Sequence, residues 1–472
     1  MIKFGTDGWR AIIADEFTFE NVRYCAQAMA EYLHESGKAS QGIAIGYDTR
    51  FASERFAAAA SEVMAGNGIH VHLCSKTTPT QVVSFGTQHL NTAGAIVITA
   101  SHNPPEWNGF KIKTSGGASA PPEVEDQIEK RIPEVIDHKR VKQISLEEGL
   151  DNGTIEYIDL YPAYAEQIGN LVDLEGIRAA GLKVAADPMF GAGAGYFRSL
   201  IGGGKTEVLE INGERNPSFP GMKQPEPVAA NLSGLCAFVT EQKARVGLAT
   251  DGDADRVGIV DEKGQPLTPL QIFALLALYL LEIRGQRGAI VRTVTTTNMV
   301  NKLAELYNVP VFETRVGFKH VAPLMISENA LIGGEESSGF GYRGHIPERD
   351  GVLSGILFLD LMAKTSKTPS ELIEWLYSKV GPHHYHRTDV EFPAEERETI
   401  IQRLTDSFPD RIAGAGIAGV NTMDGYHFRL DDDSWLLIRF SGTEPLLRIY
   451  SEAESLQRAQ ELVAEGRKIL KV

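Results

Sequence analysis

The sequence predicts an α/β protein: three tandem related α/β domains with mixed, largely parallel sheets plus a C-terminal α+β domain, placed around a central cleft. The chain has 472 residues, which is too long for one ordinary hydrophobic core and suggests about three or four domains of roughly 100–150 residues. Short apolar strands alternate with helical stretches in the same order three times. That order stops near residue 384, where a different unit begins.

The first unit, placed at residues 1–150, opens with an amphipathic helix and continues with three short strands. Val22, Ala26 and Met29 fall on one helical face, and Gly37 follows as a stop signal. The expected elements are helices at 19–36 and 55–65 and strands at 43–47, 69–73 and 95–99. The polar segment TASHNP follows the third strand directly.

The same order recurs in a second unit (151–262) and in a third (263–383). The second has expected strands at 182–186, 207–211 and 245–249, helices at 196–200 and 228–243, and the closing segment TDGDADR. The third has expected strands at 289–294, 309–313 and 331–332, a helix at 299–307, and the closing segment GGEESSG. In such sheets ligands bind beyond the carboxyl ends of the strands. Three polar loops in equivalent places therefore predict one cleft shared by three domains.

Residues 384–472 are expected to form a separate α+β domain. Its expected elements are helical stretches at 394–408 and 452–470 and strands at 427–430, 435–439 and 447–450. The segment HHYH (383–386) could bind a metal ion, but a solvated linker is the favoured interpretation. GAGIAG (414–419) has GxGxxG spacing, yet no convincing helix follows it, so we interpret it as a loop rather than a dinucleotide site.

The composition is ordinary for a globular protein, with 43% hydrophobic and 23% charged residues. A formal net charge of −16 argues against nucleic-acid and membrane-surface partners, which attract clustered Lys and Arg. The longest apolar run, 272–281, is about half of a membrane span and predicts a buried helix. Three widely spaced cysteines predict free thiols, and no signal-peptide pattern opens the sequence. We therefore expect a cytoplasmic protein.

Ser101 is placed at the end of a buried strand, within TASHNPPEWNGFK. A serine there is usually a turn or helix-cap residue. No GxSxG elbow surrounds it, so an esterase triad is poorly supported. His102 is adjacent, and neighbouring side chains in an extended segment seldom point toward one another. We therefore interpret Ser101 as a residue whose hydroxyl oxygen accepts and donates a phosphoryl group.

The segment DGDADR is the strongest single signal. Asp251, Asp253 and Asp255 alternate, so an irregular loop could converge three hard oxygen ligands on Mg²⁺. The spacing partly resembles a calcium-binding loop, but Arg256 stands where glycine is required, and strands are expected on both sides. A strand followed by DxD also suits a phosphatase with an aspartyl nucleophile, Asp251 or Asp253, which stays open as the alternative mechanism.

Two further loops carry groups that suit a sugar phosphate. In GEESSG, Glu335 and Ser337 could hold two sugar hydroxyls, since a carboxylate accepts hydrogen bonds and a hydroxyl does either. In RFSGTEP, an arginine, two hydroxyls and a glycine offer several donors to a phosphate group. The residues of this phosphate loop are Arg439, Ser441, Gly442 and Thr443.

Together these segments resemble the α-D-phosphohexomutase superfamily, whose members interconvert sugar 1-phosphates and 6-phosphates. FGTDGWR, TASHNP, DGDADR, GEESSG and RFSGTEP occur in the family's order and at similar spacing, over essentially the whole chain. The resemblance implies a phosphoserine at Ser101 and Mg²⁺ ligands at Asp251, Asp253, Asp255 and that serine. It also implies Lys111 and Arg10 near the reacting phosphate, Arg256 beside the metal, and Lys319 of VGFKH as a sugar contact.

A mutase of this kind must hold one substrate in two orientations. Phosphorylated Ser101 gives its phosphoryl group to the free hydroxyl, and the bisphosphorylated sugar turns before it returns the other phosphate. Phosphoserine, three aspartates and Mg²⁺ leave about three negative charges, which Lys111, Arg10 and Arg256 can offset. Lys111 is the first candidate for the general acid/base, because nearby cations could lower its pKa, and His102 is the second.

Within the superfamily, GEESSG is more similar to the glucose type than to the mannose or glucosamine types, although FGTDG is also similar to the glucosamine branch. We therefore expect a phosphoglucomutase, with phosphomannomutase and phosphoglucosamine mutase as alternatives. Glucose 1,6-bisphosphate is expected as activator and intermediate, a sugar phosphate as the ligand, and a monomer or homodimer as the assembly. A catalytically silent sugar-phosphate sensor is the remaining alternative.

Overall fold

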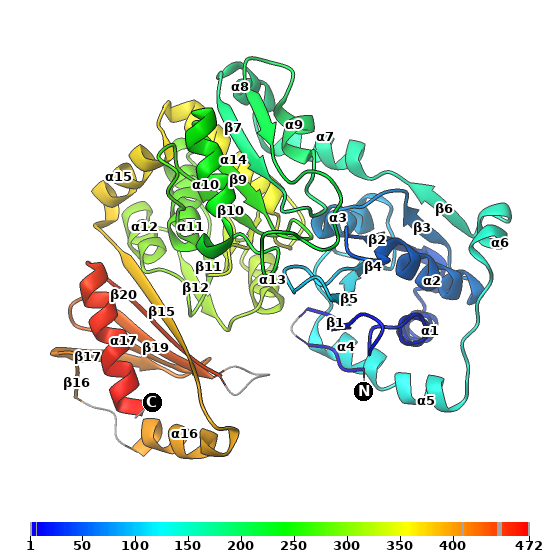
Figure 1. Ribbon diagram of the computed structural model, residues 1–472. Helices are drawn as coiled ribbons and strands as arrows, with labels where there is room; N and C mark the ends of the chain where they lie inside the picture. Colours follow the sequence, from blue (N-terminus) through cyan, green and yellow to red (C-terminus); the bar gives the residue numbers. More distant parts are fainter. Residues whose placement is uncertain (1, 6, 407–409, 441–445, 471–472) are drawn as a thin grey trace.

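The computed structural model describes residues 2–5, 7–406, 410–440 and 446–470, which form four units with a sheet each. In Figure 1 the first unit (blue to cyan) lies to the right, the second (green) at the top and the third (light green to yellow) to the left of centre. The tail sheet (orange to red) lies below the third unit. The expected α/β class with a separate tail domain is confirmed.

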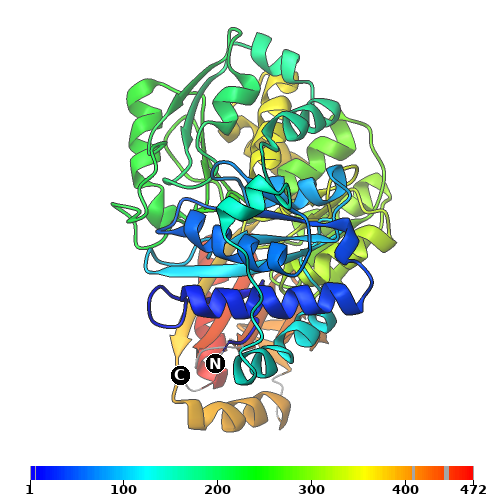
Figure 2. The same cartoon turned by 90° about the vertical axis from the view of Figure 1, so that its right-hand side faces the viewer.

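The first sheet has six strands in the order β1-β5-β4-β2-β3-β6. These are β1 (Trp9–Ile12), β2 (Ile43–Tyr47), β3 (Val71–Cys74), β4 (Gly94–Ile98), β5 (Trp107–Thr114) and β6 (Ile155–Ile158). The helices are α1 (Phe19–Glu35), η1 (Ala39–Gln41), α2 (Ser53–Gly66), α3 (Thr80–His89), α4 (Pro122–Glu129), α5 (Ile132–Asp137) and α6 (Leu146–Asp151). Thr18 caps α1 through its side chain, and α1 crosses the outer side of this unit in Figure 2. Because β6 pairs with β3, the first sheet extends beyond residue 150.

The second sheet has the order β10-β9-β7-β8 and the third β12-β11-β13-β14. The second unit contains α7 (Tyr161–Leu171), α8 (Leu174–Ala179), β7 (Lys183–Asp187), α9 (Tyr196–Ile201), β8 (Glu207–Glu210), η2 (Ala229–Asn231), α10 (Ser233–Gln242), β9 (Val246–Thr250) and β10 (Val257–Val260). The third contains α11 (Pro269–Leu278), η3 (Tyr279–Ile283), β11 (Ile290–Thr293), α12 (Met299–Tyr307), β12 (Val311–Thr314), α13 (Phe318–Ser327), β13 (Ile332–Gly334), β14 (Phe340–Tyr342), α14 (Gly351–Thr365) and α15 (Pro369–Val380).

One topology is used three times. Each sheet contains three neighbouring parallel strands, and a fourth strand returns antiparallel to the third: β5 beside β4, β10 beside β9, and β14 beside β13. The segments TASHNP, DGDADR and GEESSG are the connections within these three pairs. Of the three return strands, only a strand after DGDADR was expected, without bounds. β14 has only three residues, which carry too little periodicity, and β5 was missed although it has eight.

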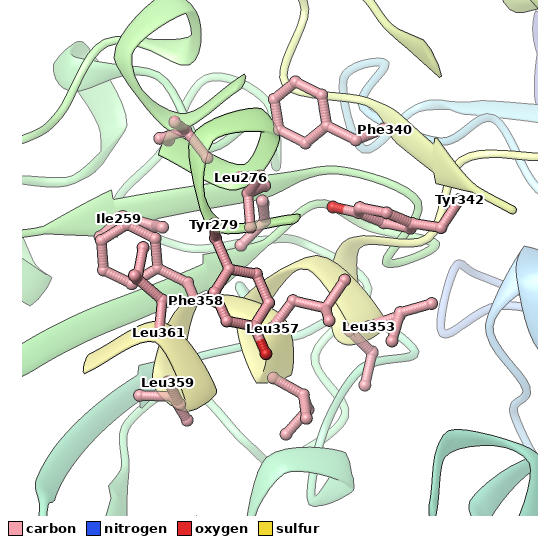
Figure 3. Packing of buried hydrophobic residues seen from close by; sticks show 14 of the residues in the cluster. Ile259, Leu276, Tyr279, Phe340, Tyr342, Leu353, Leu357, Phe358, Leu359 and Leu361 are labelled. Atoms are coloured by element: carbon pink, nitrogen blue, oxygen red, sulfur yellow. The ribbon is translucent and has the colours of Figure 1, made fainter. Parts of the chain in front are cut away.

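The apolar run at 272–281 lies in α11 and in the π-helix η3, which are buried as expected. Thr268 and Gln271 form a capping box that starts α11. Figure 3 shows how residues of α14 such as Leu357 pack with Tyr279 of η3 and Tyr342 of β14. These residues belong to one hydrophobic cluster that also takes in buried residues of the first and second units. The cluster joins the three sheets into one packed body.

The tail sheet is antiparallel throughout, in the order β15-β20-β19-β18-β17-β16. The unit contains β15 (His384–Glu391), η4 (Ala394–Glu396), α16 (Arg397–Asp406), β16 (Arg411–Ile412), β17 (Ala415–Asn421), β18 (Tyr426–Leu430), β19 (Trp435–Phe440), β20 (Leu446–Ala453) and α17 (Leu456–Leu470). Trp435, Leu437 and Tyr450 pack against Val294 of the third unit. The tail therefore has its own core and a small apolar contact with its neighbour.

Several local expectations were wrong. HHYH is not a solvated linker, because His384 to His386 begin β15 and pair with β20. Most of GAGIAG lies in β17, where glycines pair across the sheet. The helix expected from residue 452 starts at Leu456, because β20 continues to Ala453. The helix expected from residue 228 is a short 3₁₀ turn followed by α10.

Cys25 and Cys74 are buried, Cys236 is only partly buried, and all three are free thiols. Within the described residues, no helix combines the length and apolar character needed to cross a membrane.

Candidate active site

The polar loops of the first and second units meet at one place. The loop after β4 carries Ser101, and the loop after β9 carries Asp251, Asp253 and Asp255. Ser101 Oγ donates a hydrogen bond to Asp251 Oδ2 at 3.0 Å, across 150 positions of sequence. The two loops therefore share one site in the fold.

Ser101 adopts a left-handed backbone conformation, with φ of 51°, which few residues other than glycine occupy. Its N–H donates to Thr99 Oγ1 at 2.8 Å, and Thr99 Oγ1 donates to Asp48 Oδ2 at 2.6 Å. Ser101 Oγ lies 3.3 Å from His102 Nδ1, so the expectation that these adjacent side chains point apart is wrong. That expectation assumed an extended chain, and the extended strand has already ended at Ile98.

Arg50 holds the Ser101 loop from inside the protein. Its guanidinium donates to the carbonyl oxygens of Ser101 at 2.7 Å and Trp107 at 2.9 Å, and also to those of Asn103 and Pro104. Its Nε lies 3.2 Å from Asp48 Oδ2, and both side chains are buried. Sequence reasoning missed this pair. The available signal was the charged segment DTR directly after β2, a strand that neighbours β4 in the sheet.

The three aspartates of the second loop are completely buried, and one oxygen from each lies within 4.8 Å of the others. Asp253 Oδ1 and both carboxylate oxygens of Asp255 make no hydrogen bond. Burial and the charges of the other two aspartates raise the pKa of Asp251 well above its ordinary value. Buried carboxylate oxygens that make no hydrogen bond match what a hard divalent cation requires, so this group fits Mg²⁺.

Lys111 lies on β5 and is fully buried between acidic groups. Its Nζ is 2.8 Å from Asp253 Oδ2 and 2.7 Å from Asp7 Oδ2. Burial alone would lower the pKa of Lys111, but Asp253, Asp7 and Asp255 together raise it above its ordinary value. The expected lowering is therefore not found, because carboxylates rather than cations surround the ammonium group.

Three further residues expected at the site, His102, Arg10 and Arg256, lie around the Ser101 loop and the aspartate loop. Burial, followed by the charges of Arg256 and Arg10, lowers the pKa of His102 well below its ordinary value. Arg10 donates to Asn103 Oδ1 at 2.7 Å. Arg256 donates through its guanidinium to Glu226 Oε1 at 2.7 Å and through its backbone N–H to Asp251 Oδ1 at 3.1 Å. Both arginines are thus anchored to the loops that they flank.

Arg349, which was also missed, connects three parts of the site. One guanidinium nitrogen lies 2.8 Å from Asp255 Oδ2 and 3.1 Å from Asp7 Oδ2, and another lies 3.6 Å from Glu335 Oε2. Next in sequence, Asp350 caps α14 by accepting the N–H of Leu353 at 2.7 Å. The signal in the sequence was ERDG, a dense charge cluster at a helix start.

Comparison with known proteins identifies the family. Models of the four phosphoglucomutase/phosphomannomutase domains match residues 1–138, 162–264, 268–380 and 403–469, as α/β/α domains I to III and the C-terminal domain. The chain belongs to this family. Its members are mutases, so the protein is an enzyme of the isomerase class.

Individual relatives carry different substrate names within the family. A "Phosphoglucomutase/phosphomannomutase" of Thermococcus kodakarensis is 32% identical, over 99% of this chain and 98% of the relative. A "Probable phosphoglucosamine mutase" of Methanothermobacter thermautotrophicus is 31% identical, over 97% and 95%. The crystal structure of a "putative phosphomannomutase" from Thermus thermophilus superimposes with a TM-score of 0.86 at 35% identity, covering 100% of this chain and 99% of that one.

The third loop of the family pattern lies between β13 and β14. Glu335 is buried, and its Oε1 accepts the backbone N–H of Gly317 at 2.9 Å. Burial raises the pKa of Glu335, and Arg349 partly offsets this. Ser337 is partly buried in the same loop. Through Arg349, this loop is linked to the aspartate loop of the second unit.

The tail contacts the third unit beside this loop. Tyr385 Oη donates to Glu336 Oε1 at 2.9 Å. Arg439 Nε donates to Asp424 Oδ1 at 2.9 Å, and the other oxygen of Asp424 accepts the N–H of Val316 at 2.9 Å. Arg439 is thereby tied to the VGFKH segment, where Lys319 is the second residue of α13 (Phe318–Ser327). The other expected residues of the phosphate loop, Ser441, Gly442 and Thr443, lie outside the described residues.

Proposed function

We propose that this enzyme is a phosphoglucomutase, which interconverts glucose 1-phosphate and glucose 6-phosphate through phosphorylated Ser101 and a bisphosphorylated sugar. One observation carries the proposal: the Ser101 hydroxyl donates to a carboxylate of a buried three-aspartate cluster. A hydroxyl placed next to a cation site is suited to hold a phosphoryl group between two transfers.

The proposed transfer is balanced without water. The bond between phosphorus and Ser101 Oγ breaks, a bond forms between phosphorus and the sugar hydroxyl oxygen, and the proton of that hydroxyl ends on Ser101 Oγ. In the reverse step the Ser101 proton leaves, and His102 Nδ1 at 3.3 Å and Asp251 Oδ2 at 3.0 Å are the acceptors within reach. Lys111, whose pKa is raised, keeps its proton, so it is suited to donate a hydrogen bond and positive charge to the phosphoryl group rather than to transfer a proton.

The metal ligands in this proposal are Asp251, Asp253, Asp255 and the Ser101 oxygen. Mg²⁺ bound there supplies positive charge that withdraws electrons from the phosphoryl oxygens. Lys111, Arg10 and Arg256 add the fixed positive charge that a second, anionic phosphate requires. Because all three aspartates are buried, these interactions act with little screening by water.

The far end of the substrate is assigned to the third and fourth units. Glu335 and Ser337 hold sugar hydroxyls, Lys319 contacts the sugar, and the segment from Arg439 through Ser441, Gly442 and Thr443 binds the phosphate that does not react. The support is the chain of contacts that runs from Asp255 through Arg349 to Glu335, and from Arg439 through Asp424 to Val316.

Kinetics on three substrates test the sugar preference. The enzyme is assayed with glucose, mannose and glucosamine 1-phosphates, each with Mg²⁺ and catalytic glucose 1,6-bisphosphate as activator. We expect the highest kcat/KM for glucose 1-phosphate, since GEESSG is more similar to the glucose-type loop than to the mannose or glucosamine types. A higher value for mannose or glucosamine 1-phosphate would replace the proposed substrate with one of the alternatives that relatives carry in their names.

Replacing the serine separates a mutase from an aspartyl phosphatase. Ser101→Ala removes the proposed phosphoryl acceptor but leaves the aspartates in place. We expect interconversion to stop and no inorganic phosphate to be released. Release of phosphate at the wild-type rate would instead assign the reaction to an aspartate.

The expected domain limits 1–150, 151–262, 263–383 and 384–472 belong to the same proposal, with the first domain extended to include β6 (Ile155–Ile158). A cytoplasmic location and a monomeric or homodimeric state belong to it as well. Three free cysteines support the location, because unpaired thiols are typical of reducing compartments.

A further inference from the structure

A second group of metal-ligating side chains lies in the first unit, away from Ser101. His70 precedes β3, His72 lies in β3, and Glu156 lies in the neighbouring strand β6. In the strand register, His72 pairs with Glu156 of β6 and with Ala44 of β2. Ala44 in turn pairs with Ala95, so His72 lies near the same end of the sheet as the start of β4. Ser101 follows the far end of β4, so the two groups lie at opposite ends of the sheet.

The three side chains converge because of strand geometry. Residues two apart in a strand point to the same face, so His70 and His72 lie side by side, with ring centroids 4.7 Å apart. His70 Nε2 is 3.3 Å from Glu156 Oε1, and His72 Nδ1 is 2.6 Å from the same oxygen. One donor atom from each of the three residues lies within 4.8 Å of the other two.

The contacts within the group leave it incompletely satisfied. Both imidazoles approach the single oxygen Oε1 of Glu156. His72 Nδ1 is buried and makes no hydrogen bond, although it lies 2.6 Å from that oxygen. A cation between the three groups would satisfy both nitrogens and the carboxylate together.

The donor types select the ion. Two imidazole nitrogens and one carboxylate suit Zn²⁺ and similar transition-metal ions, whereas Mg²⁺ and Ca²⁺ prefer oxygen ligands only. Tetrahedral Zn²⁺ with bonds of about 2.0–2.1 Å places its donor atoms roughly 3.3 Å from each other. The separation of 3.3 Å between His70 and Glu156 already matches, and Glu156, half exposed, can withdraw to lengthen its contact with His72.

We propose that His70, His72 and Glu156 form a binding site for Zn²⁺ or a related divalent transition-metal ion, distinct from the aspartate cluster. The site joins β6, an edge strand of the first sheet, to β3. Three protein ligands leave one position for water, and the partly exposed His70 gives the ion a path from solvent. The bound ion cross-links the two strands and stabilises the first unit without touching the mutase reaction.

Zinc titration of four proteins tests the proposal, in the presence of excess Mg²⁺ to saturate the aspartate cluster. The proteins are the wild type, the double variant His70→Gln/His72→Gln, the single variant Glu156→Gln, and the control His384→Gln/His386→Gln. The control removes another His-x-His pair, from β15, which belongs to no three-ligand group among the described residues.

We expect one zinc ion per wild-type and control chain, and at least tenfold weaker binding in the His70/His72 variant and in Glu156→Gln. Zinc should raise the Tm of the wild type and the control but not that of the His70/His72 variant. All proteins should keep wild-type mutase activity with Mg²⁺ alone, which shows that the variants fold. Equal zinc affinity in the wild type and the His70/His72 variant, or a loss confined to the control, would overturn the assignment.

Discussion

Arg50 offers the most direct test of how the protein holds its reactive serine. Its guanidinium donates to four carbonyl oxygens of the segment from Ser101 to Trp107 and pairs with buried Asp48. Arg50→Lys keeps the positive charge beside Asp48, but one ammonium group cannot reach four carbonyls in the directions that a planar guanidinium does. The substitution therefore removes hydrogen bonds from the planar guanidinium to the serine loop (the guanidinium fork) and keeps the ion pair with Asp48.

The expected losses of stability and of kcat in Arg50→Lys follow from these contacts. A hydrogen bond to a charged group is worth about 1.5–3 kcal/mol when one partner is removed. Losing one or two of the four should lower the free energy of unfolding by about 1.5–6 kcal/mol, a large part of the roughly 5–15 kcal/mol of a typical domain. A serine displaced by about 1 Å should lower kcat roughly 100-fold. Arg50→Met should be worse, because it also leaves Asp48 as an unpaired buried charge.

Urea unfolding and steady-state kinetics with glucose 1-phosphate measure the two effects. Arg55→Lys is the matched control, because Arg55 lies in the same unit, is exposed and contacts the ring of Phe19 rather than the serine loop. We expect the control to keep wild-type stability and kcat. Wild-type kcat in Arg50→Lys, or an equal loss in both variants, would refute the view that this fork positions Ser101.

Three further predictions concern metal, charge and pH. Dialysis against EDTA should abolish turnover and added Mg²⁺ should restore it, whereas turnover that survives complete metal removal would exclude the aspartate cluster as the cation site. Arg349→Met should remove the cation closest to Asp255 and lower kcat/KM by about 10²–10³. This loss corresponds to an activation free energy that is higher by roughly 3–4 kcal/mol. Unchanged kinetics would contradict the view that Arg349 connects the three parts of the site. Burial, with Arg292 and Arg429 nearby, lowers the pKa of His427 from 6.5 to about 3, so the unfolded chain binds a proton first as pH falls. The free energy of unfolding should therefore fall by about 2 kcal/mol between neutral pH and pH 5 because of His427. In His427→Leu, urea unfolding at a series of pH values should show a smaller fall over this range. The same fall in the variant and the wild type would contradict the lowered pKa.

The repeated architecture could be predicted because its signals are local. Strands such as β4 and β9 are buried along their whole length, so they appear as uninterrupted apolar runs that end in polar loops. α1 was clear because its apolar face repeats with helical period over many residues and Gly37 follows shortly after its end. The π-helix η3 and the return strands carry no comparable pattern.

The site was only partly predictable, for a physical reason. Ser101 and the three aspartates stand out as chemically unusual residues directly after strands. Arg50, Asp7 and Arg349 act through long-range pairing: Arg349 meets Asp7 across 342 positions of sequence, which no local spacing encodes. Likewise, the raised pKa of Lys111 depends on which charged groups the fold places around it. The sequence does not show whether carboxylates or cations lie closest to its ammonium group.

The central claim is that Ser101 carries the phosphoryl group during the reaction. The most direct measurement incubates the enzyme with radiolabelled glucose 1,6-bisphosphate, digests it and locates the label. We predict label on the peptide that contains Ser101, and its transfer to unlabelled glucose 1-phosphate at least as fast as turnover. Continued interconversion of the sugar phosphates with no label on Ser101 would contradict the account.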